Sequence, residues 1–308
     1  MHVFVTGASG WIGSAVIPEL VAAGHRVTGL ARSDASAGAV QSSGADVVRG
    51  ELDDLGVLRA GADAADAVVH LGFKHDFTRF AESGRTERAV LETFIDALDG
   101  SERPLLFAAG VAGITSGRAV TENDVNPMAG PDAPRGGGEE LALSSVARGV
   151  RPVALRFAPS VHGDGDHGFV WALTQIAREK GTAAYVGDGS NRWAAVYRSD
   201  AARLVRLALE ATAAATPDAP APRVVHAVAE EGVATRDIAA AIGRGLGLPV
   251  TSIAPDDAAD HFGWMARFFG ADLPASSTFT RERLGWAPTG PTLLDDLATD
   301  SYFAASPR

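Results

Sequence analysis

Short runs of apolar residues alternate along the chain with longer stretches whose apolar residues recur at helical spacing. His2–Thr6 is an apolar run, Ser14–Ala23 has the spacing of a helix, and Arg26–Ala31 is a second apolar run. Similar runs predict five more strands, which are Ala45–Arg49, Ala67–Leu71, Pro104–Ala109, Pro152–Phe157 and Arg223–Val228. Because strands that alternate with helices form parallel sheets, we predict an α/β fold with helices on both faces of a doubly wound parallel sheet.

The same pattern divides the chain into a core and a mixed region. Residues 1–162 are predicted to form the core, and residues 163–308 the mixed region. Within it, residues 199–232 return one or more strands to the core, while residues 163–198 and 249–308 form a smaller lobe. After Pro249 the pattern predicts only helices and turns. Open α/β sheets bind ligands at the carboxyl ends of their strands, so we expect the lobe to complete a substrate pocket there.

The first strand breaks into a glycine-rich turn that opens the first helix. Gly7, Gly10 and Gly13 have the spacing of a dinucleotide-binding turn. In such a turn the glycines make the bend, let the backbone approach a pyrophosphate and pack the helix on the strand, with the anion at the helix N-terminus. The residues expected around the phosphates are Gly7, Ser9, Gly10, Trp11, Ile12 and Gly13. We therefore predict a nucleotide cofactor, and a turn without a ligand is the structural alternative.

Composition narrows the class of protein. Of the 308 residues, 46% are hydrophobic and 21% charged, which suits a large buried core. No run approaches the roughly 18 apolar residues of a membrane span, and the N-terminus enters a strand directly, so we expect neither a membrane segment nor a signal peptide. The absence of cysteine excludes disulfides and thiolate chemistry and fits a cytoplasmic protein. A net charge of −11 argues against a nucleic-acid partner.

Four segments together resemble those of a known family. They are Thr6–Gly13, Arg49–Asp54, Val69–Gly72 and Leu155–Gly163. Over nearly its whole length the chain is similar to the extended short-chain dehydrogenase/reductases, in the broad set labelled NAD-dependent epimerase/dehydratase. It resembles most the atypical bacterial members that carry His-Asp-Phe after the fourth strand and His-Gly-Asp-Gly-Asp-His after the sixth. The resemblance implies a Rossmann-type sheet with a smaller C-terminal substrate-binding lobe.

The end of the second strand bears on the choice between NADP(H) and NAD(H). A site that selects NAD offers a carboxylate to the ribose 2′-hydroxyl, but Ala31 stands at the matching position. Arg32 can make charge-assisted hydrogen bonds to a 2′-phosphate, and Ser33 can add a hydroxyl. These residues favour NADP(H), although strand-end arginines are also common surface residues. Asp34 could reach the ribose if its loop folds back, which keeps NAD(H) as the second choice.

The resemblance also implies contacts along the rest of the cofactor. The implied residues are Glu51 and Leu52 at the adenine, Leu71, Gly72 and Phe73 under the cofactor, and Pro159 and Val161 near the nicotinamide. Leu71 and Val161 have a structural alternative, because apolar residues at strand ends usually belong to the core.

The family's usual catalytic pair is missing from the sequence. That pair is Tyr-x-x-x-Lys on a helix, in which the lysine lowers the pKa of the tyrosine that protonates a carbonyl. None of the three tyrosines has a lysine four positions later. The matching helix start places Arg135 at the tyrosine position and Glu139 at the lysine position. The three glycines between them cost on the order of 1 kcal/mol each in a helix, so we expect the first turn to be mobile or non-helical.

Three residues are candidates for the missing acid. His162 follows the sixth strand and is the first choice, because histidine can donate a proton near neutral pH. His75 and Asp76 follow the fourth strand, where Asp76 could orient His75 as an acid or a substrate contact. Each has a structural alternative: His162 could bond the following glycine-rich turn, and Asp76 could cap the next helix.

Arg135, Trp193 and Tyr197 are the expected substrate contacts. Trp193 and Tyr197 lie in a segment that resembles the family's substrate-side strand, and packing in the core is their alternative. The segment 162–167 contains four potential metal ligands, but its alternating acids and glycines also describe a tight polar loop, so we expect no metal.

The favoured function is an NADP(H)-dependent oxidoreductase of atypical short-chain type that transfers hydride between nicotinamide and a small carbonyl-like substrate. The proton would come from His162, from His75 with Asp76, or from ordered water. A sugar-nucleotide epimerase or dehydratase is the enzymatic alternative, and a sensor that binds NADP(H) without turnover is the non-catalytic one. Apart from a small-molecule substrate we expect no nucleic acid and no membrane as partner, and a monomer or a homodimer as the assembly.

Overall fold

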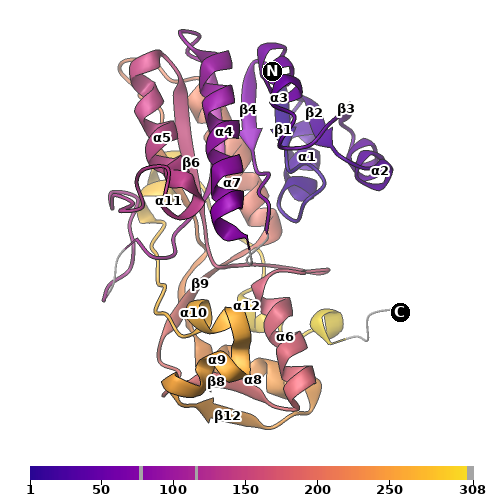
Figure 1. The fold of residues 1–308 in the computed structure, drawn as a ribbon, viewed down its shortest axis with the longest axis vertical. Coiled ribbons are helices and arrows are strands. Elements are labelled where there is room, and N and C mark those ends of the chain that lie inside the picture. The colour runs from indigo at the N-terminus through magenta and orange to yellow at the C-terminus, as the bar shows by residue number, and fades with distance from the viewer. Residues whose placement is uncertain (76–78, 115–116, 304–308) are drawn as a thin grey trace.

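The structure is a computed structural model that describes residues 1–75, 79–114 and 117–303, and its ribbon divides into a larger and a smaller half (Figure 1). Seven strands form the sheet of the larger half in the order β10-β6-β5-β4-β1-β2-β3, and all neighbours are parallel. They are β1 (His2–Thr6), β2 (Arg26–Ala31), β3 (Asp46–Arg49), β4 (Ala67–His70), β5 (Pro104–Gly110), β6 (Arg151–Phe157) and β10 (Val224–Ala227). From β1 the chain adds β2 and β3 on one side, and then returns to add β4, β5, β6 and β10 on the other side. Sheets of this kind bind ligands at the point where the strand order switches, which here lies between β1 and β4.

Helices cover both faces of this sheet. One face carries α1 (Gly13–Ala22), α2 (Asp34–Ser42) and α7 (Arg198–Ala213), and the other carries α3 (Leu55–Asp63), α4 (Phe80–Leu98) and α5 (Gly138–Ser144) (Figure 1). α1 packs on α7, and α4 packs on both α3 and α5. The predicted α/β class with a doubly wound parallel sheet is confirmed, as are all seven strands read from the apolar runs.

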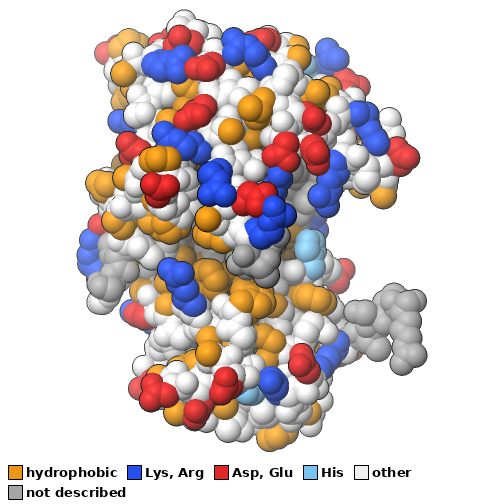
Figure 2. Space-filling model, in the orientation of Figure 1, with side chains coloured by type: hydrophobic (Ala, Val, Ile, Leu, Met, Phe, Trp, Pro, Cys, Tyr) orange, Lys and Arg blue, Asp and Glu red, His pale blue; other side chains and the backbone are white. Residues whose placement is uncertain are grey.

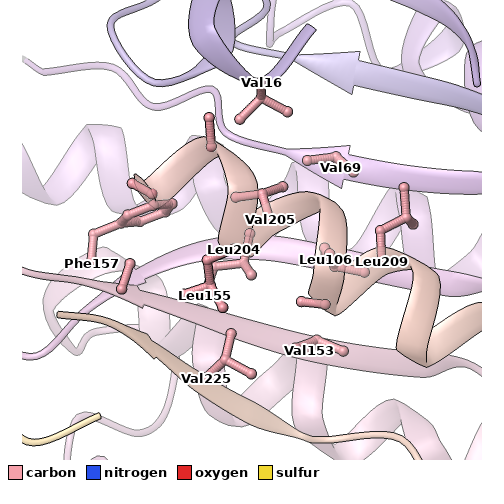
Figure 3. Close-up of a cluster of buried hydrophobic side chains, with 14 of the residues drawn as sticks. Val16, Val69, Leu106, Val153, Leu155, Phe157, Leu204, Val205, Leu209 and Val225 are labelled. Atoms are coloured by element: carbon pink, nitrogen blue, oxygen red, sulfur yellow. The ribbon is translucent and has the colours of Figure 1, made fainter. Parts of the chain in front are cut away.

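Side chains that alternate between the two faces of the sheet divide the core into two layers. Val3 and Val5 belong to the cluster beneath α1 and α7, whereas Phe4 between them packs edge-on against Phe94 of α4, with ring centroids 6.3 Å apart. Successive side chains of a strand point to opposite faces. Both faces of this sheet are covered, which explains why its strands are continuous hydrophobic runs. Figure 3 shows the first layer, in which side chains of α7 lie over those of β6.

The smaller half contains two short sheets. β7 (Ser160–His162), β9 (Arg192–Tyr197) and β11 (Glu230–Ala234) form one, and β8 (Ala183–Val186) pairs with β12 (Val250–Ile253) in the other. Its helices are α6 (Phe169–Lys180), α8 (Thr235–Leu246), α9 (Ala258–Phe262), α10 (Ala266–Phe269) and α12 (Leu293–Asp296). α11 (Thr278–Leu284) packs on α7 and β10 of the larger half. The 3₁₀ segments are η1 (Pro134–Gly137), η2 (Ser145–Arg148), η3 (Pro255–Asp257), η4 (Gly263–Met265) and η5 (Asp300–Tyr302).

One prediction about the smaller half is wrong. The chain after Pro249 is not only helices and turns, because Val250–Ile253 forms β12, which is parallel to β8. The first three side chains of β12 are exposed, so the strand carries no apolar signal. Strand β11 and helix α8 also pack in this half, which therefore includes residues 230–246. Across the described ranges, no helix is long and apolar enough to cross a membrane.

Candidate nucleotide and substrate site

The glycine-rich turn lies at the carboxyl end of β1, against the segment that leaves β4. Gly7 has a φ of 66°, and a Cβ atom built there would lie 2.6 Å from the amide nitrogen of Gly72. A Cβ atom built on Gly13 would lie 2.1 Å from the carbonyl oxygen of Gly7. Both positions require glycine, because neither distance leaves room for a side chain.

The start of α1 is open to an anion. Its N-cap is Ile12, which offers no side-chain hydrogen bond, and Ser9 and Gly10 before it are exposed. Amide groups at an uncapped helix N-terminus attract anions through their N–H bonds and the helix dipole. The residues present therefore fit the pyrophosphate of a dinucleotide.

Three side chains at the end of β2 were predicted to bear on the choice of cofactor, and they differ in whether they already have partners within the protein. Arg32 is exposed, and within the described part of the chain it has no hydrogen-bond or ion-pair partner. The Ser33 hydroxyl caps α2 by accepting a 3.2 Å hydrogen bond from the amide of Ser36. Asp34 forms an ion pair with Arg49 at 2.9 Å. The guanidinium of Arg32 is therefore available to a ligand, whereas the carboxylate of Asp34 is held by a neighbour.

The other residues expected along the cofactor lie around the glycine turn. Glu51 is exposed beyond β3. The side chain of Leu52 lies over Gly72, since a Cβ atom built on Gly72 would be 3.0 Å from the Leu52 Cδ2 atom. Leu71 and Phe73 flank Gly72 and are half-buried. Glu51 and Leu52 follow β3, whereas Leu71, Gly72 and Phe73 follow β4, which pairs with β1, the strand that ends in the glycine turn.

Trp11 joins the glycine turn to the smaller half. Its Nε1 donates a 2.7 Å hydrogen bond to the carbonyl oxygen of Val161 in β7. The Arg198 guanidinium lies 4.1 Å from the indole centroid, and its Nε donates a 2.7 Å hydrogen bond to the Trp11 carbonyl. The ring of His167 packs edge-on against the indole at 5.4 Å. Two predicted cofactor residues, Trp11 and Val161, are thus in direct contact, and Pro159 lies half-buried two positions before Val161.

His162 lies in the interior of the protein. Its side chain is fully buried, and its Nδ1 lies 2.9 Å from a carboxylate oxygen of Asp296 in α12. Its ring packs edge-on against Tyr197, with centroids 5.5 Å apart, and its Nε2 has no partner within the described residues. A general acid must come within hydrogen-bond reach of its substrate. The geometry therefore gives no support to His162 as the acid.

Trp193 is also a core residue. Its indole is fully buried, donates a 3.1 Å hydrogen bond to the carbonyl of Phe268 and packs edge-on against Phe269. The prediction that Trp193 contacts substrate is wrong in this structure, because none of its surface is accessible. Tyr197 is half-buried at the end of β9 and packs tightly against Gly290, where a Cβ atom would lie 2.6 Å from the tyrosine ring.

Asp166 connects the loop after β7 to the C-terminal segment. One carboxylate oxygen accepts a 2.6 Å hydrogen bond from the Gly168 amide, and the other accepts a 3.0 Å hydrogen bond from the Tyr302 hydroxyl. That hydroxyl in turn accepts a 3.2 Å hydrogen bond from the Gly163 amide. Burial raises the pKa of Asp166. Among the described residues, no three His, Asp or Glu side chains are grouped so that they could hold a metal ion.

Arg135, Phe73 and His75 form a cluster where β4 and the turn before α5 meet. The guanidinium carbon of Arg135 lies 4.4 Å from the centroid of the Phe73 ring, and the imidazole of His75 packs edge-on against that ring at 5.2 Å. Burial, together with the positive charge of Arg135, lowers the pKa of His75. Asp76, its predicted partner, lies outside the described residues.

Figure 2 shows hydrophobic side chains gathered along the junction between the two halves of the molecule.

A left-handed turn puts Arg135 in this cluster. Arg135 has a φ of 56° and Gly136 a φ of 62°, both in the region that favours glycine. A Cβ atom built on Gly136 would lie 2.3 Å from the carbonyl oxygen of Gly84, so the turn lies directly on α4. The regular helix α5 begins only at Gly138. The expectation of a non-helical first turn is therefore confirmed.

Behind the cluster runs a buried hydrogen-bond chain that the sequence analysis missed. Glu87 of α4 accepts a 3.1 Å hydrogen bond from Arg135 Nη2, and its other oxygen lies 3.2 Å from His70 Nε2. His70 Nδ1 lies 2.6 Å from the Thr6 hydroxyl, which accepts a 3.3 Å hydrogen bond from the Gly72 amide. Burial alone would raise the pKa of Glu87, but Arg135 and His70 outweigh it and lower that pKa. The available sequence signal was a glutamate within the apolar stripe of a helix.

Glu139, at the lysine position of the family, has a structural contact. It is buried and accepts a 3.1 Å hydrogen bond from Arg156 Nε of β6. Arg156 also donates a 2.9 Å hydrogen bond to the carbonyl of Asp124, and its Nη1 lies 3.4 Å from Nε2 of buried His226. The ion pair between Glu139 and Arg156 joins α5 to β6 of the large sheet, and the sequence analysis did not predict it.

Comparisons with known proteins agree with this geometry. Residues 7–128 match a family model described as NAD(P)H-binding. An uncharacterized protein of Schizosaccharomyces pombe is 42% identical over 303 residues, which cover 98% of this chain and 100% of that protein. An uncharacterized protein of Saccharomyces cerevisiae is also 42% identical, over 96% of this chain and 98% of its own. The chain therefore belongs to one family with these two yeast proteins, and it has an NAD(P)H-binding domain and a fold like that of the atypical short-chain dehydrogenase/reductases.

More distant relatives include a named enzyme. A 2-alkyl-3-oxoalkanoate reductase of Stenotrophomonas maltophilia is 29% identical over 233 residues, or 69% of this chain and 66% of that one. Among solved structures, MoeE5 in complex with UDP-glucose and NAD is 23% identical, with a TM-score of 0.70 over 98% of this chain and 97% of that one. The UDP-glucose 4-epimerase of Thermotoga maritima is 19% identical, with a TM-score of 0.74 over 98% of each chain. These two likenesses concern the fold alone.

Proposed function

We propose that this short-chain dehydrogenase/reductase is an NADP(H)-dependent oxidoreductase that reduces a small carbonyl-like compound without the usual tyrosine and lysine. The observation that carries the proposal is the glycine turn, where Gly7 and Gly13 leave no room for a side chain and α1 begins uncapped. The name of the Stenotrophomonas maltophilia relative supports reduction as the reaction class.

The preference for NADP(H) rests on charge at the end of β2. A 2′-phosphate would find the exposed guanidinium of Arg32, which can form charge-assisted hydrogen bonds. A 2′-hydroxyl would need a carboxylate, and the nearest acid in sequence, Asp34, is paired with Arg49. The site therefore offers more to the phosphorylated cofactor than to NAD(H).

The bound cofactor would supply the hydride, and the chain's own residues would position the carbonyl and provide its proton. His75 is the better placed of the predicted acids, since it lies beside Phe73 and Arg135 instead of in the core. Its lowered pKa keeps the imidazole neutral at physiological pH. Neutral His75 can donate an N–H hydrogen bond to the substrate or pass on a proton from water, which is the role we assign to it.

The experiment is to incubate the protein with NADPH and a panel of aldehydes, ketones, imines and activated alkenes, and to follow the absorbance of the reduced cofactor. Turnover of at least one carbonyl compound is the expected result. Binding of NADPH by calorimetry without turnover of any compound would reject the reductase and favour a cofactor-binding sensor. Absence of binding for both NADPH and NADH would reject the cofactor site itself.

A further inference from the structure

We propose that Arg135 donates the hydrogen bond that the substrate oxygen needs during reduction, and that buried Glu87 is the positioning residue that aims it. The proposal rests on the reductase function and assigns the residues that replace the missing tyrosine. Its evidence is the left-handed backbone of Arg135, the contacts that hold its side chain from two sides, and the buried chain that continues to the glycine turn.

The backbone of Arg135 is held in a costly conformation. Its φ of 56° is one of two positive φ values at non-glycine residues within the described ranges. Such a conformation is disfavoured for a residue with a Cβ atom and persists only where the surroundings fix it. Here the following Gly136 packs on Gly84 of α4, and Arg88 Nη1 donates a 3.0 Å hydrogen bond to the Gly136 carbonyl. The turn is therefore rigid and presents the arginine from a fixed point.

The side chain of Arg135 is fixed on two sides but not covered. Glu87, only 3% exposed, accepts from Nη2 at 3.1 Å, and the guanidinium lies over the Phe73 ring. The side chain keeps 31% of its surface exposed. A guanidinium has five N–H donors, and this geometry uses one of them for Glu87. Donors are therefore left for a ligand above Phe73, the residue predicted to run under the cofactor.

The chain of contacts behind Glu87 continues without a break to the glycine turn. Glu87 is ionised because its pKa is lowered, so a carboxylate oxygen accepts from His70 Nε2. His70 Nδ1 lies 2.6 Å from the Thr6 hydroxyl oxygen, which accepts a hydrogen bond from the Gly72 amide. All three side chains are at most 3% exposed. The Glu87 carboxylate is thus connected to Gly72, which lies against the glycine turn. This connection fixes the position of Arg135 relative to the proposed cofactor site.

The chemical step balances with these groups. The carbonyl carbon gains a hydride, its π-electron pair moves to oxygen, and that oxygen takes a proton, so that carbonyl, NADPH and H⁺ give alcohol and NADP⁺. Arg135 stabilises the negative charge that develops on oxygen but keeps its own proton, because guanidinium is not deprotonated in proteins. The proton comes from water or through His75.

The test compares Arg135→Gln, Arg135→Lys, Glu87→Gln and the Arg135→Gln/Glu87→Gln double variant, with Arg85→Gln on the exposed face of α4 as the matched control. For a carbonyl compound that the wild type reduces, Arg135→Gln is expected to lower kcat about 100-fold or more, the usual effect of losing one oxyanion donor. Arg135→Lys should restore part of the loss. Glu87→Gln should lower kcat, yet add nothing in the Arg135→Gln background, because it acts through Arg135.

Two readouts separate this role from a structural one. Calorimetry should give unchanged NADPH affinity for each variant. An NMR titration of the His75 imidazole should show its pKa raised by Arg135→Gln, which removes a nearby positive charge, and lowered by Glu87→Gln. Arg135→Gln with wild-type kcat, or a Glu87→Gln loss that multiplies that of Arg135→Gln, would overturn the proposal while leaving the reductase intact. A wild type without turnover would reject the reductase, and this inference with it.

Discussion

The indole Nε1 of Trp11 donates a 2.7 Å hydrogen bond to the carbonyl oxygen of Val161. This contact links the turn that follows the first strand to β7, 150 residues later in the chain. The guanidinium of Arg198, at the start of α7, and the ring of His167, in the loop after β7, both pack on the indole. Trp11 therefore connects the glycine turn to the smaller half through a hydrogen bond and ring packing.

Trp11→Phe should weaken this junction. Phenylalanine keeps part of the ring packing but lacks the N–H, so the Val161 carbonyl loses its donor, at a cost of about 1 kcal/mol. Urea denaturation should report that loss in the free energy of unfolding. Trp171→Phe on α6 is the control, because Trp171 is 38% exposed and its substitution should leave the unfolding free energy unchanged. Equal effects of the two substitutions would contradict the role of the hydrogen bond.

Gly13→Ala should disrupt the nucleotide turn. The new Cβ would meet the Gly7 carbonyl oxygen at 2.1 Å, which backbone atoms cannot accommodate without moving. Overpacking of this kind costs about 1–3 kcal/mol, and the displaced turn should bind NADPH at least about tenfold more weakly, which is 1.4 kcal/mol. Calorimetry measures the affinity. Gly38→Ala is the control, since nothing lies within 4 Å of its Cβ in α2 and alanine favours the helix.

Arg32→Gln should reduce the affinity for NADPH and not for NADH. Hydrogen bonds to a charged group contribute about 1.5–3 kcal/mol, or roughly ten- to a hundredfold in Kd. Calorimetric titration with both cofactors isolates the 2′-phosphate, because the two differ only in that group. Arg59→Gln, an exposed arginine on α3, should change neither affinity. If Arg32→Gln weakened both cofactors equally, the preference for NADP(H) would have no basis at this residue.

His162→Ala should affect stability more than chemistry. The substitution leaves the carboxylate of Asp296, which is only 5% exposed, without its partner in the interior. An unsatisfied buried group costs about 1–3 kcal/mol. Urea denaturation should therefore show a less stable protein, while kcat for NADPH oxidation at low temperature should stay near that of the wild type. A fall in kcat of about 100-fold in the folded variant would instead restore His162 as the general acid.

The sequence predicted the large sheet because its seven strands are covered on both faces and are therefore apolar throughout. The strand β12 was missed for the opposite reason: its Val250, Thr251 and Ser252 are exposed and carry no such pattern. Site residues were less predictable. A tryptophan in a core and one in a pocket have the same sequence signal, which is why Trp193 was misplaced. The Glu87 contact with Arg135 spans 48 residues, so only the folded chain brings the two together.

Asp166→Asn should stabilise the protein at neutral and alkaline pH. Burial raises the pKa of Asp166, so the folded protein binds a proton at this site more readily than the unfolded chain, whose aspartates titrate near about pH 3.9. An acid whose pKa is higher in the folded protein than in the unfolded chain stabilises the fold while it is protonated. That contribution is fully present below the pKa of the unfolded chain and is lost as the pH rises through the pKa of the folded protein. Asparagine cannot ionise and so avoids that loss. Its amide group can still bond the Tyr302 hydroxyl and the Gly168 amide.

The measurement is urea denaturation of wild type and Asp166→Asn across the pH range from about 4 to 8, which brackets the ordinary carboxyl pKa and neutrality. The difference in unfolding free energy should grow in favour of the variant as the pH rises. Asp164→Asn is the control two residues earlier, because Asp164 is exposed and should show no such trend. Parallel curves for wild type and Asp166→Asn would mean that the buried carboxyl ionises as easily in the folded protein as in the unfolded chain.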